Sequence, residues 1–308
     1  MLIVVNEDAG SAERQAVAAA VAVLGEADAV DLAYSRDRAQ LDEILDGRKG
    51  RRMVIAGGDG SLHTVVAALH SRGELQDCRL GLLPFGTGND LARGLGIPLD
   101  PESAARVVIS GRPRRLDLLV DDTGGVVLNA VHLGIGARAA QAAGALKSWL
   151  GRFAFPLGAF SVGLRTRGWR LEVRVDGNPV GDSRSRVLMV AVSNGPSIAG
   201  GIAHLHPEAV PHDGLAEVVI SRAVGPVARI GYAVDLSRGK HLARRDVQVV
   251  RGRHVTVTGD PFFTVADGEI AGPTTHRTWT LKPAAWQLSV PRSENPPPRQ
   301  HTPEATEA

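Results

Sequence analysis

Hydrophobic positions in the first third of the chain follow two alternating periods. Short apolar runs, typical of buried strands, occur at Leu2–Val5, Ala29–Tyr34, Met53–Ala56 and Leu80–Leu83. Between them, hydrophobic residues recur at helical spacing, as at Val17, Ala20, Val21 and Leu24 and again at Leu62, Val65, Val66 and Leu69. Strands that alternate with helices at this spacing predict a parallel sheet with helices on both faces.

After about residue 120 the pattern changes to strands. Apolar or alternating runs occupy Val126–Val131, Trp169–Val175, Val187–Val192, Leu215–Ile220, Val247–Val250, Val255–Thr258, Phe262–Ala266 and Thr278–Leu281. In the second of these runs every other residue is apolar, which is the period of a half-buried strand. This part of the chain therefore predicts a β-sandwich-like domain with few helices.

The change of pattern predicts two domains that meet near Asp121–Gly125. We expect an α/β domain over residues 1–121 and a β-rich domain over residues 122–290, whose last strand, 286–290, is able to return to the first domain. Residues 291–308 are rich in proline and are expected to be disordered.

Composition narrows the class of protein. The chain has 308 residues and a net charge of +2, and this near balance argues against a dedicated nucleic-acid-binding protein. A single cysteine, Cys78, excludes an internal disulfide and a paired-cysteine metal site, which favours a reducing, cytoplasmic setting. No apolar run is long enough to predict a membrane-spanning helix.

Two glycine-rich loops carry the candidate chemistry. Gly57–Ser61 (GGDGS) joins a predicted strand to a predicted helix, where a helix amino terminus can bind phosphate and Asp59 can act on it through a metal ion. Leu83–Asp90 (LPFGTGND) follows the next strand. Paired loops at the carboxyl ends of successive strands indicate a nucleotide crevice. Ordinary turns, with acidic residues as helix caps, are the alternative.

The loops resemble conserved blocks of the diacylglycerol kinase-like lipid kinases, which include bacterial diacylglycerol and phosphatidylglycerol kinases and sphingoid-base and ceramide kinases. Gly57–Ser61 is similar to the family's GGDGT motif, and Leu83–Arg93 (LPFGTGNDLAR) is similar to its LPxGTxNDxAR block. Further similar blocks follow in family order at Asn6–Gly10, Arg115–Asp117, Leu128–Ala137, Asn194, Gly200–Gly201, Pro207–Leu215, Asp267–Glu269 and Leu281–Pro291. The resemblance runs from residue 2 to about residue 291.

The resemblance implies an α/β nucleotide-binding domain of the NAD kinase type, followed by the β-rich domain, and it implies roles for single residues. ATP would be held by Asn6, Gly57, Gly58, Asp59, Gly60, Ser61, Leu62, His63, Gly86, Thr87, Asn89 and Asp90. Asp267 or Glu269 would act as the catalytic base at the acceptor hydroxyl, and we favour Glu269. Asp213, with backbone carbonyls of Val210 and Leu215, would bind a structural Mg²⁺.

Three positions depart from the family pattern. Ser61 replaces the usual threonine, and His63 and Thr64 stand where an Asn-Glu pair is usual. The imidazole is compatible with phosphate binding and would add pH dependence. Without the resemblance, Asp267–Glu269 reads as a turn between two strands, because Asp-Gly is a common turn pair.

One segment has the composition of a lipid-facing surface. Leu146–Trp169 combines aromatic residues with arginine and lysine, which suits a membrane interface. The alternative is an amphipathic helix packed on the β-rich domain.

These observations predict an ATP- and Mg²⁺-dependent lipid kinase that transfers the γ-phosphate to a lipid hydroxyl. It would be cytoplasmic, with peripheral contact at the inner face of the membrane and no nucleic-acid partner. A homodimer is left open. The alternatives are an NAD kinase, a kinase of a non-lipid alcohol, and a catalytically weak nucleotide-binding relative; His63 and Thr64 favour the last.

Overall fold

The computed structural model describes residues 1–7, 11–135, 137, 167–181, 185–198, 200–201 and 205–292. Most of the predicted lipid-facing segment Leu146–Trp169 and nearly all of the predicted tail lie outside these residues, as does much of the Asn6–Gly10 motif. No described helix is long and apolar enough to cross a membrane.

The first half alternates strands and helices as predicted. Its elements are β1 (Leu2–Asn6), α1 (Ser11–Gly25), β2 (Asp31–Ser35), α2 (Arg38–Gly47), β3 (Met53–Gly57), α3 (Asp59–Ser71), β4 (Arg79–Pro84), α4 (Asp90–Gly94) and α5 (Pro101–Ser110). The strands pair in parallel in the order β2-β1-β3-β4. Asp100 caps α5, because its carboxylate accepts the Ser103 N–H at 2.9 Å.

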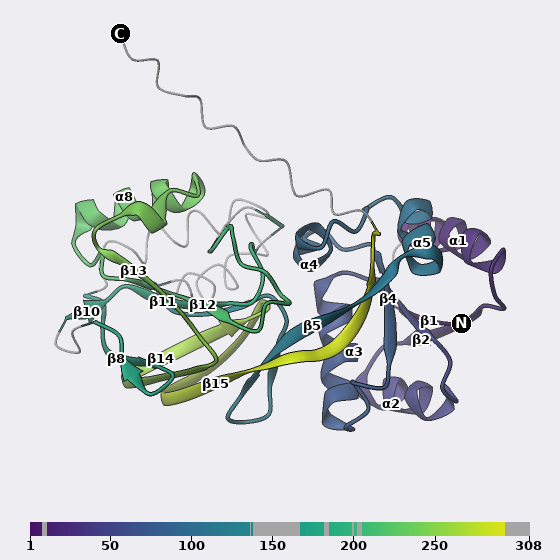
Figure 1. Cartoon of the computed structure of the whole chain (residues 1–308), viewed down its shortest axis with the longest axis horizontal. Coiled ribbons are helices and arrows are strands. Elements are labelled where there is room, and N and C mark those ends of the chain that lie inside the picture. The colour runs from purple at the N-terminus through teal and green to yellow at the C-terminus, as the bar shows by residue number, and fades with distance from the viewer. Residues whose placement is uncertain are drawn as a thin grey trace, which may run out of the picture.

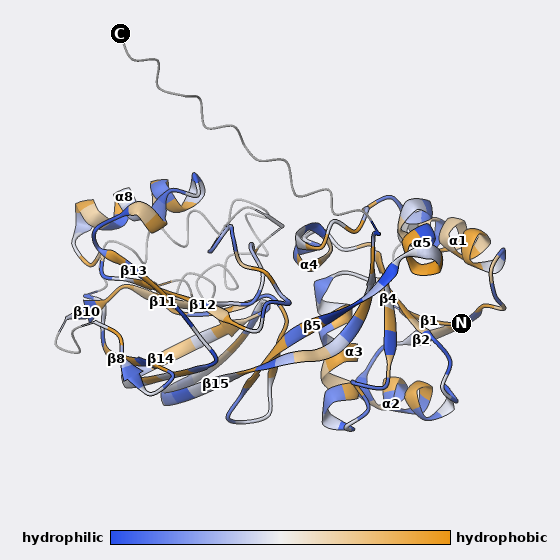
Figure 2. Cartoon of the chain, in the orientation of Figure 1, coloured by the Kyte–Doolittle hydropathy of each residue, from blue (hydrophilic) through white to orange (hydrophobic). Residues whose placement is uncertain are grey.

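Alternate residues of these strands enter two cores, one on each face of the parallel sheet. In β1, Ile3 and Val5 pack with α1 and α5, whereas Val4 packs with α2 and α3. Helices therefore cover both faces, with α1 and α5 on one side and α2 and α3 on the other (Figure 1). In Figure 2, hydrophobic residues concentrate along these buried strands.

The second half is built mainly of antiparallel strands. Its elements are β5 (Arg112–Asp121), β6 (Val126–Val127), β7 (Ala130–Gly134), β8 (Trp169–Val175), β9 (Asn178–Pro179), β10 (Arg186–Val187), β11 (Met189–Ser193), β12 (Ala216–Ser221), α8 (Pro226–Ser237), the 3₁₀ helix η2 (His241–Ala243), β13 (Val247–Gly252), β14 (His254–Ala266) and β15 (Glu269–Val290). Phe262 and Trp279 are among the largest side chains of its core.

Strand β15 joins the two halves into one sheet. Its early residues pair with β14, and its later residues pair with β5 and, through Gln287 and Leu288, in parallel with β4. A bulge interrupts the pairing with β5 between Lys282 and Trp286. The buried Asp117 carboxylate holds this bulge, because it accepts the Ala284 N–H at 2.8 Å.

Several local expectations were wrong. The predicted strand Val187–Val192 is divided between β10 and β11, and the predicted strands Val255–Thr258 and Phe262–Ala266 form one strand, β14. The run Val126–Val131 forms two strands, β6 and β7, because the backbone at Leu128 and Asn129 turns its N–H groups to a distant carboxylate instead of a sheet partner. The 12-residue helix α8 was missed, since its sequence contains a proline and a glycine and follows a region of strand patterns.

Candidate active site

The two glycine loops meet backbone to backbone. A Cβ atom placed on Gly58 would lie 2.8 Å from Cα of Gly86, and one placed on Gly86 would lie 2.5 Å from Cα of Gly58. The Phe85 N–H also donates to the Gly57 carbonyl at 3.1 Å. Only glycine fits at both contact positions. The close approach of the two loops therefore requires glycine at Gly58 and at Gly86.

The first loop leaves the amino terminus of α3 without a side-chain cap. Gly58 occupies the N-cap position and makes no side-chain hydrogen bond. The N–H groups of the first turn of a helix have no partner within the helix, and the helix dipole favours an anion there. This arrangement agrees with the predicted phosphate-binding role of Gly57–Ser61.

Asn89 shapes the second loop from within. Its side chain is buried, accepts the Gly86 N–H at 3.1 Å and donates to the carbonyls of Gly86 at 2.6 Å and Pro84 at 3.3 Å. Its backbone has φ of 52°, a left-handed conformation that asparagine tolerates. Thr87 lies exposed at the tip of the same loop. Asn89 thus holds the loop, and Thr87 is left accessible to a ligand.

Asp59 caps a helix, although not the one it belongs to. Its carboxylate accepts the N–H groups of Asp90 at 3.0 Å and Leu91 at 3.3 Å, at the start of α4. Burial raises the pKa of Asp59 above its ordinary value, while these N–H donors act in the opposite direction. The structure shows Asp59 as the acidic cap of α4, where it joins the two glycine loops. Its predicted action on phosphate through a metal ion stays a prediction.

Asp90 extends this connection to the second half of the chain. Its carboxylate accepts the Ser197 hydroxyl at 2.9 Å and the N–H groups of Gly200 and Gly201, both at 2.8 Å. Gly200 has φ of 74° and packs closely on Gly88. A continuous set of hydrogen bonds therefore runs from the first loop through α4 to Ser197, Gly200 and Gly201. The sequence indicated Asp90 as a nucleotide ligand or a helix cap, but it did not indicate these hydrogen bonds to the second half of the chain.

Asp267 is held by three consecutive backbone N–H groups. Its carboxylate accepts from Leu128 at 2.6 Å, Asn129 at 2.9 Å and Ala130 at 3.2 Å. Asp267 and Gly268 have φ of 45° and 94° and form the turn between β14 and β15, so the turn reading is also correct. Burial raises the pKa of Asp267, against the effect of the three donors.

His63 brings the first half to this turn. Its Nε2 lies 3.0 Å from the carbonyl oxygen of Val126, two residues before the N–H groups that hold Asp267. The charge of His63 favours the ionised form of Asp267 and so opposes the rise of its pKa. Thr64, the other departure from the family pattern, bonds the Gly60 carbonyl at 2.9 Å within α3.

The two candidate catalytic acids have different surroundings. Glu269 is exposed at the first residue of β15 and, among the described residues, makes no side-chain hydrogen bond, whereas Asp267 is fixed next to the His63 contact. The assignment of the catalytic base stays a prediction. The geometry favours Asp267, whereas the sequence favoured Glu269.

The predicted Mg²⁺ site is occupied by a guanidinium group. Arg251 pairs with Asp213 and donates to Glu217 at 3.1 Å, and Asp213 also accepts the Leu215 N–H at 3.1 Å. The Val210 carbonyl accepts the His212 N–H at 2.8 Å. Because Arg251 neutralises Asp213, these residues do not fit a cation in this arrangement. The Mg²⁺ assignment stays a prediction.

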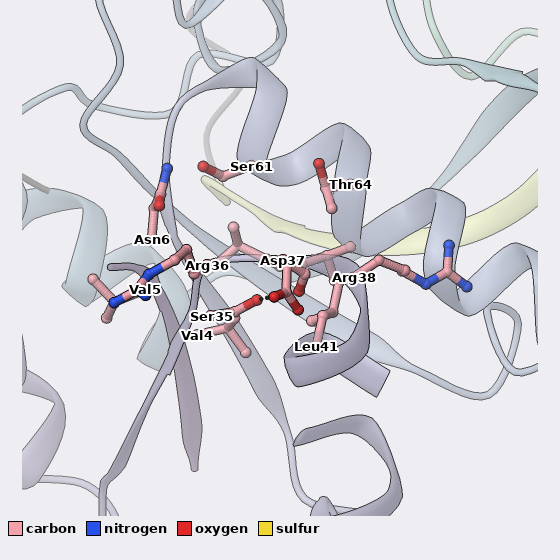
Figure 3. A pocket seen from close by; sticks show the side chains of 12 residues that line it. Val4, Val5, Asn6, Ser35, Arg36, Asp37, Arg38, Leu41, Ser61 and Thr64 are labelled. Carbon is pink, nitrogen blue, oxygen red and sulfur yellow. Dashed lines mark hydrogen bonds between the residues drawn. The ribbon is translucent and has the colours of Figure 1, made fainter. Parts of the chain in front are cut away.

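A pocket lies at the carboxyl ends of β1, β2 and β3 (Figure 3). Its polar lining includes the predicted Asn6 and Ser61 together with Ser35, Arg36 and Arg38. Arg36 bonds the Glu7 carboxylate at 2.6 Å. Sequence reasoning missed the residues after β2, although their polar cluster directly after an apolar run was the available signal. Gly57–Gly60 and Gly86–Asp90 do not line this pocket.

Comparison with known proteins finds family models that match both halves of the chain and solved structures with the same fold. Residues 1–120 match the family "Diacylglycerol kinase catalytic domain", and residues 129–290 match the family "YegS C-terminal NAD kinase beta sandwich-like domain". A diacylglycerol kinase from Bacillus anthracis superposes with a TM-score of 0.70 at 18% identity, over 94% of this chain and 96% of that chain. An NAD kinase from Archaeoglobus fulgidus, in complex with ATP, superposes with a TM-score of 0.52 at 14% identity, over 94% of both chains.

Curated relatives agree with the family models. A Chromohalobacter salexigens protein named "Probable lipid kinase YegS-like" is 32% identical over 60% of this chain and 58% of its own length. The Bacillus subtilis protein named "Diacylglycerol kinase" is 28% identical over 71% of both chains. The chain thus spans less than two thirds of the first of these relatives.

Two glycine loops on a parallel sheet, continuous with a β-rich half, form the fold that lipid and NAD kinases share. Within that class, the chain belongs to the diacylglycerol kinase-like lipid kinase family. The predicted fold class, with its NAD kinase-like first domain and β-sandwich-like second domain, is confirmed.

Proposed function

We propose that this protein is an ATP-dependent lipid kinase that transfers the γ-phosphate of ATP to a hydroxyl of a diacylglycerol-like or sphingoid lipid. The observation that carries the proposal is the set of hydrogen bonds from Asp59 through Asp90 to Gly200 and Gly201, which fixes both glycine loops against the second half. Phosphoryl transfer is catalysed mainly by positioning and by stabilising charge, and a fixed pair of loops serves both.

In this proposal the donor phosphates lie at the amino terminus of α3. The uncapped first turn and the Thr87 hydroxyl supply donors for the phosphate oxygens. Mg²⁺ bound to ATP, as part of the substrate, would offset the phosphate charge. Asn6 and Ser61, in the pocket at the ends of β1 to β3, would contact the remainder of the nucleotide.

The acceptor hydroxyl is proposed to lie near the turn between β14 and β15. Its oxygen forms a bond to the γ-phosphorus, the bond from that phosphorus to the β–γ bridging oxygen breaks, and ADP leaves. The proton of the hydroxyl passes to a carboxylate. A raised pKa, as for Asp267, makes the ionised carboxylate a stronger proton acceptor. The acceptor lipid would be reached from the cytoplasm, at the inner face of the membrane.

The test is ATP turnover on a panel of acceptors: diacylglycerol, a sphingoid base, ceramide, phosphatidylglycerol, glycerol and NAD. We expect phosphorylation of at least one lipid and none of NAD or glycerol. Turnover on NAD alone, or on glycerol alone, would contradict the lipid assignment. Binding of ATP with no turnover on any acceptor would instead identify a nucleotide-binding relative.

The paired variants Asp267→Asn and Glu269→Gln identify which carboxylate accepts the proton of the hydroxyl. Each variant removes one carboxylate with little change of shape. We expect Asp267→Asn to lose roughly 10²-fold or more in turnover and Glu269→Gln to lose less. A larger loss of turnover in Glu269→Gln than in Asp267→Asn would instead identify Glu269 as the catalytic base.

A further inference from the structure

Helix α8 is apolar on two opposite sides. Ala228, Tyr232 and Leu236 pack inward on the face formed by β7, β11, β12 and β13. On the other side, Val227, Ile230 and Val234 are 84%, 54% and 40% exposed. Helix α8 lies on the outside of the β-rich half, and hydrophobic and hydrophilic residues mix along its length (Figures 1 and 2). A surface helix ordinarily exposes polar residues, so this outer face requires an explanation.

The charges beside this face have one sign. Arg238, Lys240 and Arg245 are exposed just beyond the helix and form no ion pair with another described residue. The neighbouring acids, Asp235 and Asp246, both pair with Arg244 at 2.8 Å. The outer face therefore combines branched apolar side chains with cations that have no acidic counterpart nearby.

We propose that this surface, consisting of Val227, Ile230, Val234, Arg238, Lys240 and Arg245, docks on an anionic lipid bilayer. Apolar side chains that enter the boundary between headgroups and acyl chains, flanked by cations at the headgroups, are typical of interfacial helices. The proposal rests on the proposed function in one respect, since an enzyme with a lipid acceptor must reach a bilayer. It assigns that contact to α8, a helix far along the chain from both glycine loops.

A second copy of the chain is the competing occupant, and the charges argue against it. A two-fold interface brings the same patch of both copies together. The cations at its edge would then face like charges, with no exposed acid of α8 to pair with them. Three branched side chains also provide little of the area that a stable dimer interface buries.

The experiment is co-sedimentation of the full chain with vesicles of phosphatidylcholine alone or mixed with phosphatidylglycerol. Two triple variants divide the surface: Val227→Ser with Ile230→Ser and Val234→Ser, and Arg238→Gln with Lys240→Gln and Arg245→Gln. The matched control is Leu32→Ser with Leu99→Ser, which removes exposed apolar side chains elsewhere. The midpoint of thermal unfolding checks that each variant is folded.

We expect the wild type and the control to bind vesicles that contain phosphatidylglycerol, and to release them at high salt. The charge variant should lose roughly fivefold in affinity per cation removed, and the apolar variant should lose most of its binding. Unchanged binding by both variants would overturn the proposal. So would a concentration-dependent dimer, measured by light scattering, that the apolar variant abolishes.

A water-soluble, short-chain form of the lipid acceptor that the panel identifies separates this proposal from the proposed function. Both α8 variants should phosphorylate it as fast as the wild type, and only turnover on lipid in vesicles should fall. An equal loss on both acceptors would contradict a docking role. If the wild type phosphorylates no acceptor of the panel yet still binds anionic vesicles through α8, the kinase assignment fails and the docking surface stands.

Discussion

The Asp59 carboxylate accepts the Asp90 backbone N–H at 3.0 Å, so a side chain of the first glycine loop caps the helix that follows the second. The same carboxylate accepts the N–H of Leu91, and each oxygen serves one donor. The acidic residue of the GGDGS motif is thus a structural link between the two loops. Its effect on phosphate binding would be exerted through the position of the loops.

Asp59→Asn should weaken this link. An amide side chain has one acceptor oxygen, so one of the two N–H groups would face an NH₂ group. We expect a loss of about 1–2 kcal/mol in the free energy of unfolding, measured with denaturant, and a parallel loss of ATP turnover. The control is Asp100→Asn, since Asp100 caps α5 through a single N–H and asparagine can replace it. Equal losses in both variants would contradict the two-donor role.

Gly86→Ala should separate the two loops. The new Cβ would lie 2.5 Å from Cα of Gly58, and neither backbone can give way without moving its loop. We expect destabilisation of about 1–3 kcal/mol and a loss of turnover of roughly 10²-fold. Gly47→Ala is the control, because nothing lies within 4 Å of a Cβ at that position. Isothermal titration with ATP would show whether the defect arises in nucleotide binding.

His63 variants should separate a hydrogen bond from a charge. His63→Ala removes the 3.0 Å contact with the Val126 carbonyl, at a cost of about 1 kcal/mol, and removes a charge that favours ionised Asp267. The pKa of Asp267 should then rise further, and the acid limb of the pH–rate profile should move to higher pH. His63→Asn also removes the charge, so it should move that limb by the same amount. Its amide can still donate to the Val126 carbonyl, so this variant should keep the stability of the wild type. An unmoved limb in both variants would show that Asp267 does not control the rate.

The pH dependence of stability tests the raised pKa of Asp267 directly. Between the ordinary value of 3.8 and the higher value in the folded state, the folded protein keeps a proton that the unfolded chain has released. Stability from this group therefore falls as the pH rises through that window. Asp267→Asn should remove this part of the slope in a series of thermal unfolding midpoints. A slope of the same size in the variant would assign it to other groups.

Arg251→Gln should expose the carboxylates at the predicted Mg²⁺ site. In the wild type, Arg251 pairs with Asp213 and Glu217, so we expect Mg²⁺ to leave the unfolding midpoint unchanged. The variant should be less stable in the absence of Mg²⁺, since two acids lose their counter-charge, and should be partly rescued by it. Strong stabilisation of the wild type by Mg²⁺ would show that a cation displaces the guanidinium, as the family resemblance implies.

Much of the first half was predictable because its information is local. The strand runs and the helical period place Met53–Gly57 before Gly58, and parallel strands necessarily bring the two glycine loops to one edge of the sheet. The contact between Gly58 and Gly86 follows from that arrangement.

The remaining parts depend on partners far apart in the chain. Asp267 bonds residues more than 130 positions earlier, and Asp90 bonds residues more than 100 positions later. No period in the sequence encodes such pairs. The run Val126–Val131 was therefore predicted to be one strand, without the break between β6 and β7. For the same reason the position of His63 against Val126 was not foreseen.

Strand β15 limits how the two halves of the chain can move. One strand is hydrogen-bonded to β14 in one half and to β4 and β5 in the other, and the Asp117 carboxylate pins its bulge at Ala284. A hinge rotation of the halves would have to break this ladder, which many closing enzymes avoid by using a loop as the hinge. The catalytic geometry should therefore be preorganised before substrates arrive. Under the proposed function, discrimination between acceptors would then arise from the fixed arrangement of the residues around the β14–β15 turn, with little contribution from induced fit.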